Sequence, residues 1–215
     1  MTTPTLPVPG DRLRGVNLGG WLLLEKWITP SLFAGLAATD ETTYCAELGL
    51  DEATRRLHHH WQTFITRDDF AWLARTGINA VRLPVGHWLF GPDYPYLRSY
   101  GSARHPFVVG GLAIVDQVFA WAEEFGLRVV LDQVFNHTAS SGQDNKSVLD
   151  RIVPGYYHRL NAAGGVETST CCQNVATEHE MAEPLMVDSV VTWARDYRVD
   201  GFRFDLMGHH SFDNM

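Results

Sequence analysis

The chain of 215 residues is poor in cysteine, and its few cysteines do not predict a disulfide framework. There are three, which leaves an odd thiol, and Cys171 and Cys172 are adjacent in sequence and badly placed to bridge each other. No Cys-x-x-Cys pair occurs, and no Cys/His spacing of the kind found in zinc sites. We therefore expect Cys45 and the adjacent pair to be unpaired structural thiols, and we expect no cofactor.

Positive charge is scarce. Lys and Arg number 17 against 25 Asp and Glu, which gives a formal net charge of -8, and the basic residues form no cluster. A nucleic-acid partner needs a basic face that neutralises phosphates. The composition therefore excludes nucleic acid as a partner, whereas a neutral substrate such as a sugar is compatible with it.

Long hydrophobic runs are also missing. Residues 1–13 contain neither the basic segment nor the apolar segment of a signal peptide, and no run approaches the length that crosses a membrane. We expect a cytoplasmic protein without a membrane partner, although secretion is also compatible if sequence upstream is missing.

What the chain does contain is enough apolar residues for a sizeable core, because 45% of it is hydrophobic and 12% aromatic. One domain or two fit this length. Asp40 and Asp51 can each cap a helix, and Thr66 begins a capping-box pattern. Apolar stripes predict two further helices, one starting at Leu112 and one near Pro184.

Strands are predicted at 13–18, 78–85 and 199–206 and within 126–138, in alternation with these helices. That order is the signature of successive βαβ units and a parallel sheet. A loop of about forty residues without sustained periodicity follows Thr138, and loops of that length usually carry function or are disordered. In parallel sheets, ligands collect at the carboxyl ends of the strands.

The stretch 126–138 is an apolar strand that ends in polar residues. Alternation places Asp132 and Asn136 on one face of it and turns Gln133 to the other face. A carboxylate and an amide on a hydrophobic strand need partners or a ligand. A satisfied core aspartate at the end of an ordinary strand explains the pattern equally well.

Polar side chains also mark the other strand ends. Arg203 and Asp205 share one face of the last strand, and Asn17 and Arg82 project to the corresponding side of the first two. We expect Arg82 to be paired or to face a polar cavity, and we expect Arg203 to pair with Asp132. Asp205, the most terminal carboxylate, is the best candidate for a nucleophile. A purely structural network is the alternative.

The segments RGVNLGGWLLLEKWITPSLF, INAVRLPVGHWLFG and VDQVFAWAEEFGLRVVLD follow one another over roughly residues 12–132. They resemble glycoside hydrolase family 5, in its exo-β-1,3-glucanase branch. This resemblance implies that Glu25 and Arg82 contact the sugar or support the catalytic carboxylates. It stops at residues 133–135, where that family has Leu-His-Gly and this chain has Gln-Val-Phe.

From about Leu127 to the end, the segments VVLDQVFNHT, STCCQNVATEHEM and VDGFRFDLMGHH resemble the pullulanase-type enzymes of glycoside hydrolase family 13. Two of these segments correspond to that family's first and second conserved regions. The resemblance implies that Asp205 is the catalytic nucleophile and that Arg203 is its electrostatic partner.

The same resemblance implies roles for four more residues. His137 would donate a hydrogen bond to the sugar in the cleavage subsite, Asp132 would be a structural acid beneath it, and His209 would line the acceptor side. Asn136 matches a position that ligates calcium in many amylase-type relatives, and no other calcium ligand is evident in the sequence.

Both families have (β/α)8 barrels. The resemblances therefore imply an α/β fold, a partial TIM barrel of about the first four βα units, as a single truncated glycosidase-type domain over residues 1–215. Its segments 12–132 and 127–215 look like a chimera joined at a shared strand. A half barrel exposes sheet edges, so self-association is expected.

The sequence leads to three hypotheses about function. The first is a retaining glycoside hydrolase with Asp205 as nucleophile, acting like a pullulanase on α-1,6 linkages of α-glucans, or alternatively like an exo-β-1,3-glucanase. Retaining enzymes need a second carboxyl group as acid, and the matching Glu falls outside this chain. The second is a non-catalytic glucan binder that uses Trp21, Trp27 and Trp88 as platforms. The third is a recombined or truncated half barrel without activity.

Overall fold

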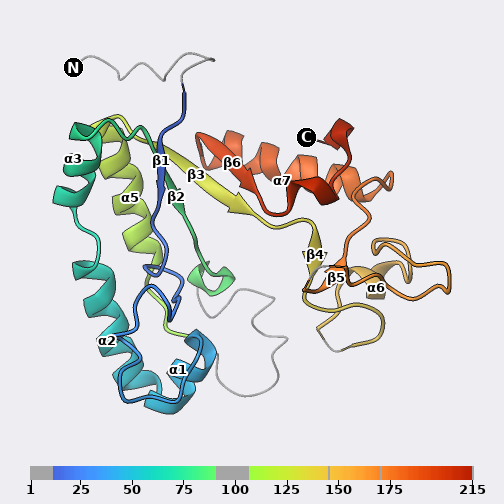
Figure 1. The fold of residues 1–215 in the computed structure, drawn as a ribbon, viewed down its shortest axis with the longest axis horizontal. Coiled ribbons are helices and arrows are strands. Elements are labelled where there is room, and N and C mark those ends of the chain that lie inside the picture. Colours follow the sequence, from blue (N-terminus) through green and yellow to red (C-terminus); the bar gives the residue numbers. More distant parts are fainter. Residues whose placement is uncertain (1–11, 91–106, 145, 170, 215) are drawn as a thin grey trace. The chain divides into compact units, whose positions relative to one another are not determined.

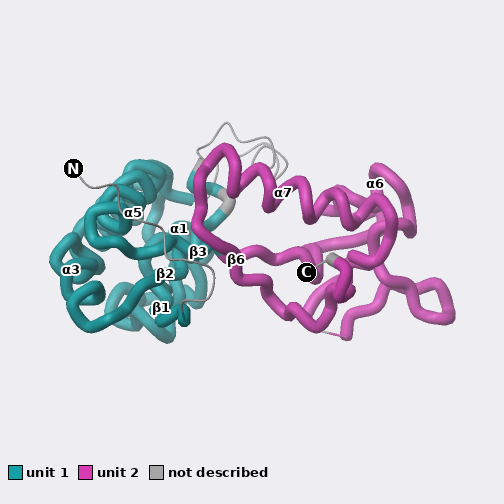
Figure 2. The backbone as a smooth tube through the Cα atoms, turned by 90° about the horizontal axis from the view of Figure 1, so that it is seen from above, with its two compact units in different colours: residues 1–131 teal, residues 132–215 magenta. Residues whose placement is uncertain are grey.

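The computed structural model describes residues 12–90, 107–144, 146–169 and 171–214. It divides into two compact units, residues 1–131 and 132–215 (Figure 2). The proline, glycine and tyrosine content of residues 86–110 also predicts a loop there, and most of this segment lies outside the described residues.

A sheet of four short strands organises the fold (Figure 1). Its order is β1-β2-β3-β6, and its strands are β1 (Gly15–Asn17), β2 (Ala80–Leu83), β3 (Arg128–Gln133) and β6 (Gly201–Phe204). β2 pairs in parallel with β1 and with β3. The α/β prediction is confirmed, and half of a (β/α)8 barrel stays a prediction. Each strand is shorter than the segment predicted for it.

Three helices follow β1 in unit 1: α1 (Glu41–Leu48), α2 (Leu50–Thr63) and α3 (Arg67–Arg75). The predicted caps at Asp40 and Thr66 are confirmed as capping boxes. The cap predicted at Asp51 is wrong, because α2 already begins at Leu50 and Asp51 lies in its first turn. Gly49, with a φ of 75°, ends α1 and starts α2 in a conformation that favours glycine.

The core of unit 1 lies between the sheet and its helices. α5 (Leu112–Phe125) buries Ile114, Val118 and Ala122, so the apolar stripe is shifted from the predicted start at Leu112, which is 44% exposed. The 21 buried residues of this core cluster run from Leu18 to Val129, so all of them belong to unit 1.

Unit 2 contains the long loop after Thr138, which is more ordered than its lack of periodicity suggests. It holds α6 (Leu149–Ile152) and β5 (Gln173–Asn174), and β5 pairs antiparallel with β4 (His137–Thr138). The buried Asp150 carboxylate anchors the loop by accepting hydrogen bonds from the backbone N–H groups of residues 142 and 155 and by lying 3.0 Å from His158 Nδ1.

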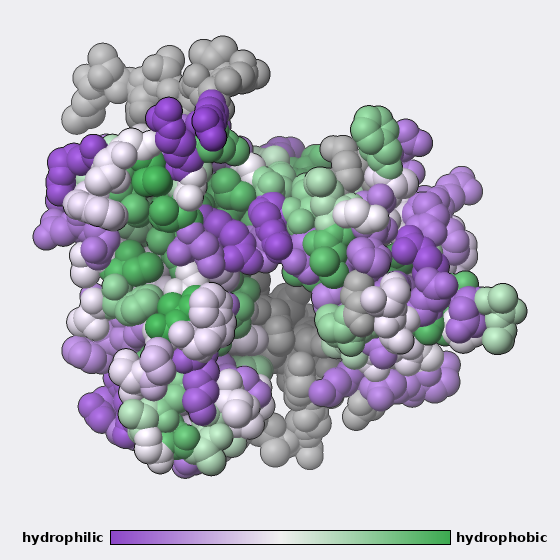
Figure 3. All heavy atoms as spheres, in the orientation of Figure 1, coloured by the Kyte–Doolittle hydropathy of each residue, from purple (hydrophilic) through white to green (hydrophobic). Residues whose placement is uncertain are grey.

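The chain of unit 2 ends with one long helix, β6 and two short 3-10 turns. α7 (Ala182–Asp196) begins two residues before the predicted Pro184, and η2 (Met207–His209) follows β6. None of the described helices is both long and apolar enough to cross a membrane. On the face of each unit that Figure 3 displays, hydrophobic residues are interspersed with hydrophilic ones.

Candidate active site

A guanidinium joins two carboxylates at the strand ends of unit 2. Arg203 Nη1, from β6, donates to Asp132 Oδ1 at 3.0 Å and to Asp205 Oδ1 at 2.7 Å. The hydrogen bond to Asp132, followed by that to Asp205, raises the pKa of Arg203 above its ordinary value. The predicted pairing of Arg203 with Asp132 is therefore confirmed, and the same nitrogen also holds Asp205.

The backbone fixes the position of Asp205 from both sides. Its N–H donates to the carbonyl of Gln133 at 2.9 Å. The next residue, Leu206, has a φ of 45° and a ψ of 50°, a left-handed conformation that costs an L side chain roughly 1 to 2 kcal/mol. Strain of this kind is concentrated at functional sites, because it persists only where the surrounding structure enforces it.

His137 and His209 lie on separate elements of unit 2. The His137 ring has Asn136 Nδ2 at 2.8 Å from its Nδ1 and Cys171 Sγ at 4.0 Å from its Nε2. The His209 backbone accepts a hydrogen bond from Arg159 at 3.4 Å. Their expected contacts with sugar stay predictions.

Asn136 is fully buried, and its Oδ1 has no hydrogen-bond partner in the structure. An orphaned buried oxygen suits a cation ligand. Calcium takes six to eight oxygen ligands, however, and the possible metal ligands that the described residues bring together beside Asn136 are one imidazole and two thiols. The surroundings therefore do not fit calcium, and we route no step through it.

The two thiols were missed as site residues in the sequence. Cys171 and Cys172 lie 34 and 35 residues after His137, but the donor atoms of the three side chains lie within 4.8 Å of one another. The sequence shows no Cys/His spacing of the kind found in zinc sites, and the structure nevertheless brings these three side chains together. The pairing of β4 with β5 creates the group, and no spacing rule reveals it.

Unit 1 has a separate polar group at the end of β1 and β2. Arg82 Nη1 donates to Asn17 Oδ1 at 2.7 Å, as expected of an arginine within an apolar strand. Glu25 Oε2 accepts from the Gly20 N–H at 3.0 Å. A Cβ at Gly19 would lie 2.6 Å from Glu25 Oε2 and 2.8 Å from Asn17 Nδ2, so only glycine lets these side chains approach.

The aromatic residues considered as sugar platforms differ in exposure. Trp21 is completely buried and donates from Nε1 to the carbonyl of Trp61 at 2.9 Å, so its proposed platform role is wrong. Trp88 stacks on Phe107 with ring centroids 4.0 Å apart. Trp27 is 78% exposed and stands two residues after Glu25, so it is open to a ligand.

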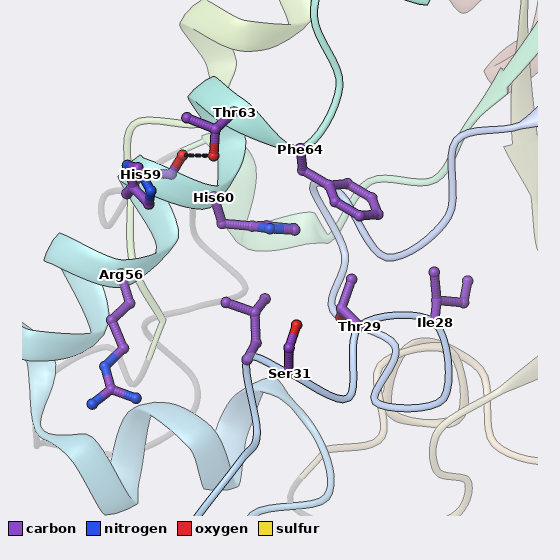
Figure 4. A pocket seen from close by; sticks show the side chains of 9 residues that line it. Ile28, Thr29, Ser31, Arg56, His59, His60, Thr63 and Phe64 are labelled. Carbon is purple, nitrogen blue, oxygen red and sulfur yellow. Dashed lines mark hydrogen bonds between the residues drawn. The ribbon is translucent and has the colours of Figure 1, made fainter.

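A cavity of about 230 Å³ opens elsewhere in unit 1, between α2 and the loop that follows Glu25 (Figure 4). His60 and Phe64 point toward the loop residues Thr29 and Ser31. His60 Nε2 lies 2.8 Å from the carbonyl of Gly20, and burial lowers the pKa of this imidazole. None of the residues that line this cavity belongs to the site predicted from the sequence.

A search of known protein families finds none that matches this chain. Among curated proteins, "Probable glucan 1,3-beta-glucosidase A" of Aspergillus fumigatus is 47% identical over 137 residues, which is 62% of this chain and 30% of that protein. "Glucan 1,3-beta-glucosidase 1" of Schizosaccharomyces pombe is 40% identical over 202 residues, which is 92% of this chain and 47% of that protein. The chain thus spans less than half the length of either relative.

Solved structures of pullulanases share the fold. Pullulanase type I of Bacillus subtilis, in complex with maltose, is 29% identical with a TM-score of 0.50, over 67% of this chain and 22% of that one. A ligand-free PulA mutant from Klebsiella pneumoniae has a TM-score of 0.54 at 21% identity, over 94% of this chain and 25% of that one.

Both sets of relatives are glycoside hydrolases. The chain is therefore related to glucan-hydrolysing enzymes of two kinds, and both resemblances seen in the sequence are supported. The alignment with the S. pombe protein covers 92% of the chain, so it extends beyond the segment 12–132. That the chain is a chimera of two enzymes stays a prediction.

Proposed function

We propose that this chain is part of a hydrolase of β-1,3-glucan. The observation that supports this substrate over others is the 40% to 47% identity to proteins named glucan 1,3-beta-glucosidase. The α-1,6 linkages of α-glucans, favoured from the sequence, become the second candidate, because the pullulanase structures match this chain with TM-scores of only 0.50 and 0.54.

In unit 1, the polar group at the end of β1 and β2 offers the sugar both kinds of hydrogen-bonding group. The Arg82 guanidinium donates, and the Glu25 carboxylate accepts. Trp27, exposed in the same loop as Glu25, offers an apolar ring face against which a pyranose can pack. We infer that these three residues hold the terminal sugars of the glucan.

In unit 2, the joint contact of Arg203 with Asp132 and Asp205 favours the second candidate. The Arg203 guanidinium holds the Asp205 side chain in place, and a carboxylate can act as a nucleophile. Asp205 would form a bond to the anomeric carbon as the bond from that carbon to the glycosidic oxygen breaks. The departing oxygen needs a proton from a carboxylic acid, and this cluster, whose two carboxylates both contact Arg203, does not supply one.

The two candidates are separated by measuring binding of laminari- and malto-oligosaccharides to the purified chain by calorimetry. We expect laminari-oligosaccharides to bind, and Glu25→Gln to weaken their binding about tenfold or more, because a hydrogen bond to a charged acceptor is replaced by a weaker one to a neutral acceptor. Glu47→Gln is the matched control, since Glu47 also anchors a loop by accepting backbone N–H groups, at 3.1 and 2.8 Å. Equal binding in both variants contradicts the assignment of Glu25.

Hydrolysis is measured as reducing sugar released from laminarin and from pullulan. Release from pullulan that Asp205→Asn abolishes would favour the second candidate. Asp196→Asn is its control, because Asp196 also pairs with an arginine, at 2.7 Å, on the exposed surface of α7. If the chain neither binds nor hydrolyses either glucan, both proposals are overturned, and the third hypothesis, a half barrel without activity, is favoured.

A further inference from the structure

The pairing of β4 with β5 brings an imidazole and two thiols together in unit 2. His137 is the register partner of Asn174, and the two cysteines lie just before β5. Cys171 Sγ is 4.0 Å from His137 Nε2, and the ligand atoms that the three side chains offer all lie within 4.8 Å of one another. Both thiols are free, Cys171 is exposed, and Cys172 is partly exposed, so a dissolved ion can reach them.

These donors are of the type that zinc prefers. A tetrahedral Zn²⁺ has bonds of about 2.3 Å to sulfur and about 2.0 Å to nitrogen, which places neighbouring donors about 3.5 Å apart. Cys171 Sγ and His137 Nε2, which are 4.0 Å apart, therefore need only a small side-chain movement to bind the same ion. Three protein ligands leave the fourth position open to water or another ligand.

Asn136 can orient the imidazole for this role. A zinc-bound Nε2 requires the proton on Nδ1, and metal-binding histidines usually donate that proton to a fixed acceptor. Asn136 is fully buried, with its amide 2.8 Å from Nδ1 and its Oδ1 without a partner. Oxygen and nitrogen of an amide occupy nearly the same space, so a half-turn of the amide lets Oδ1 accept from Nδ1.

We propose that His137, Cys171 and Cys172 form a zinc site, with Asn136 orienting His137. Cys45 takes no part, because it is buried within unit 1. Zinc binding at these residues does not depend on which glucan the chain acts on. A bound ion would, however, occupy the imidazole nitrogen that is expected to face the sugar.

The test is calorimetric titration of the reduced full chain with Zn²⁺, and with Ca²⁺ for comparison. We expect one equivalent of Zn²⁺ to bind and Ca²⁺ not to bind. Co²⁺ in place of Zn²⁺ should give a thiolate-to-metal charge-transfer absorption, which reports sulfur ligands directly. A stoichiometry of zero, or a cobalt spectrum without that absorption, overturns the proposal.

Variants assign the ligands. Cys171→Ser combined with Cys172→Ser, and His137→Gln alone, should each weaken zinc binding about 100-fold or more, and Asn136→Leu about 10-fold. Cys45→Ser and His59→Gln, which change a thiol and an imidazole in unit 1, are the controls and should bind zinc as the parent does.

Circular dichroism in the absence of metal identifies any variant that fails to fold. If Asn136→Leu fails to fold, the smaller change Asn136→Asp replaces it. Unchanged binding in the double cysteine variant, or a disulfide between the two cysteines after full reduction and gentle reoxidation in zinc, contradicts the site.

Discussion

Glu41 is a carboxyl group buried in the core of unit 1. It begins α1 and is only 4% exposed. Burial raises its pKa from 4.5 to about 7. Hydrogen bonding to the Leu24 N–H and to the Trp88 side chain lowers the pKa and offsets the effect of burial only in part. The folded chain therefore holds a proton at Glu41 at pH values at which the unfolded chain has released it.

This burial predicts the pH dependence of stability. Between pH 4.5 and about 7, the folded state binds more protons than the unfolded state, so the free energy of unfolding falls as the pH rises, by up to about 3 kcal/mol from this group. We expect Glu41→Gln to remove that fall in urea unfolding measured across this window. Glu47→Gln, on the exposed side of α1, should leave it unchanged, and an equal pH slope in all three proteins would show that Glu41 is not the source.

At the scale of the helix, the two aspartates that the sequence predicts as helix caps have different roles. Asp40 accepts a hydrogen bond from Thr43 N at 2.8 Å and caps α1, whereas Asp51 is inside α2. We expect Asp40→Ala to lower the free energy of unfolding by about 1 kcal/mol and Asp51→Ala by about 0.3 kcal/mol, the value of a charge near a helix start. Chemical denaturation measures both, and equal losses would contradict the assignment of the caps.

The helices were predictable because their signals are local. The capping boxes at Asp40 and Thr66 involve residues within three positions of each other, and both are confirmed. Asp51 failed as a cap because Gly49 both ends α1 and starts α2, and a sequence pattern does not reveal such a shared junction. The strands were located correctly but drawn too long, because pairing depends on the length of the neighbouring strand.

The contacts of the site were predictable where they follow from the alternation of side chains between the two faces of a strand. The contact of Arg203 with Asp132 required only that the two strands be neighbours with these residues on one face. The thiols beside His137 were not predictable, because their position depends on how the loop between β4 and β5 closes. Trp21 was misjudged as a platform because apolar content alone does not distinguish a buried ring from an exposed one.

At the scale of the whole chain, the two units differ in how much apolar surface they bury. The core cluster draws all of its residues from 18–129. In α7 of unit 2, Met186 is buried, while Leu185 and Val191 are 48% and 46% exposed. Since hydrophobic burial dominates stability, unit 2 should be the less stable of the two.

The two units should therefore unfold in separate transitions. Leu57→Ala and Met186→Ala each remove a side chain that is at most 2% exposed, one in each unit, and each should cost about 2 to 5 kcal/mol. Every tryptophan except Trp193 lies in unit 1, so fluorescence in urea follows that unit and circular dichroism follows both. We expect Leu57→Ala to shift the fluorescence transition and Met186→Ala to shift only an earlier transition in circular dichroism. A single transition, moved equally by both variants, would mean that the strand shared by the two units couples them into one cooperative structure.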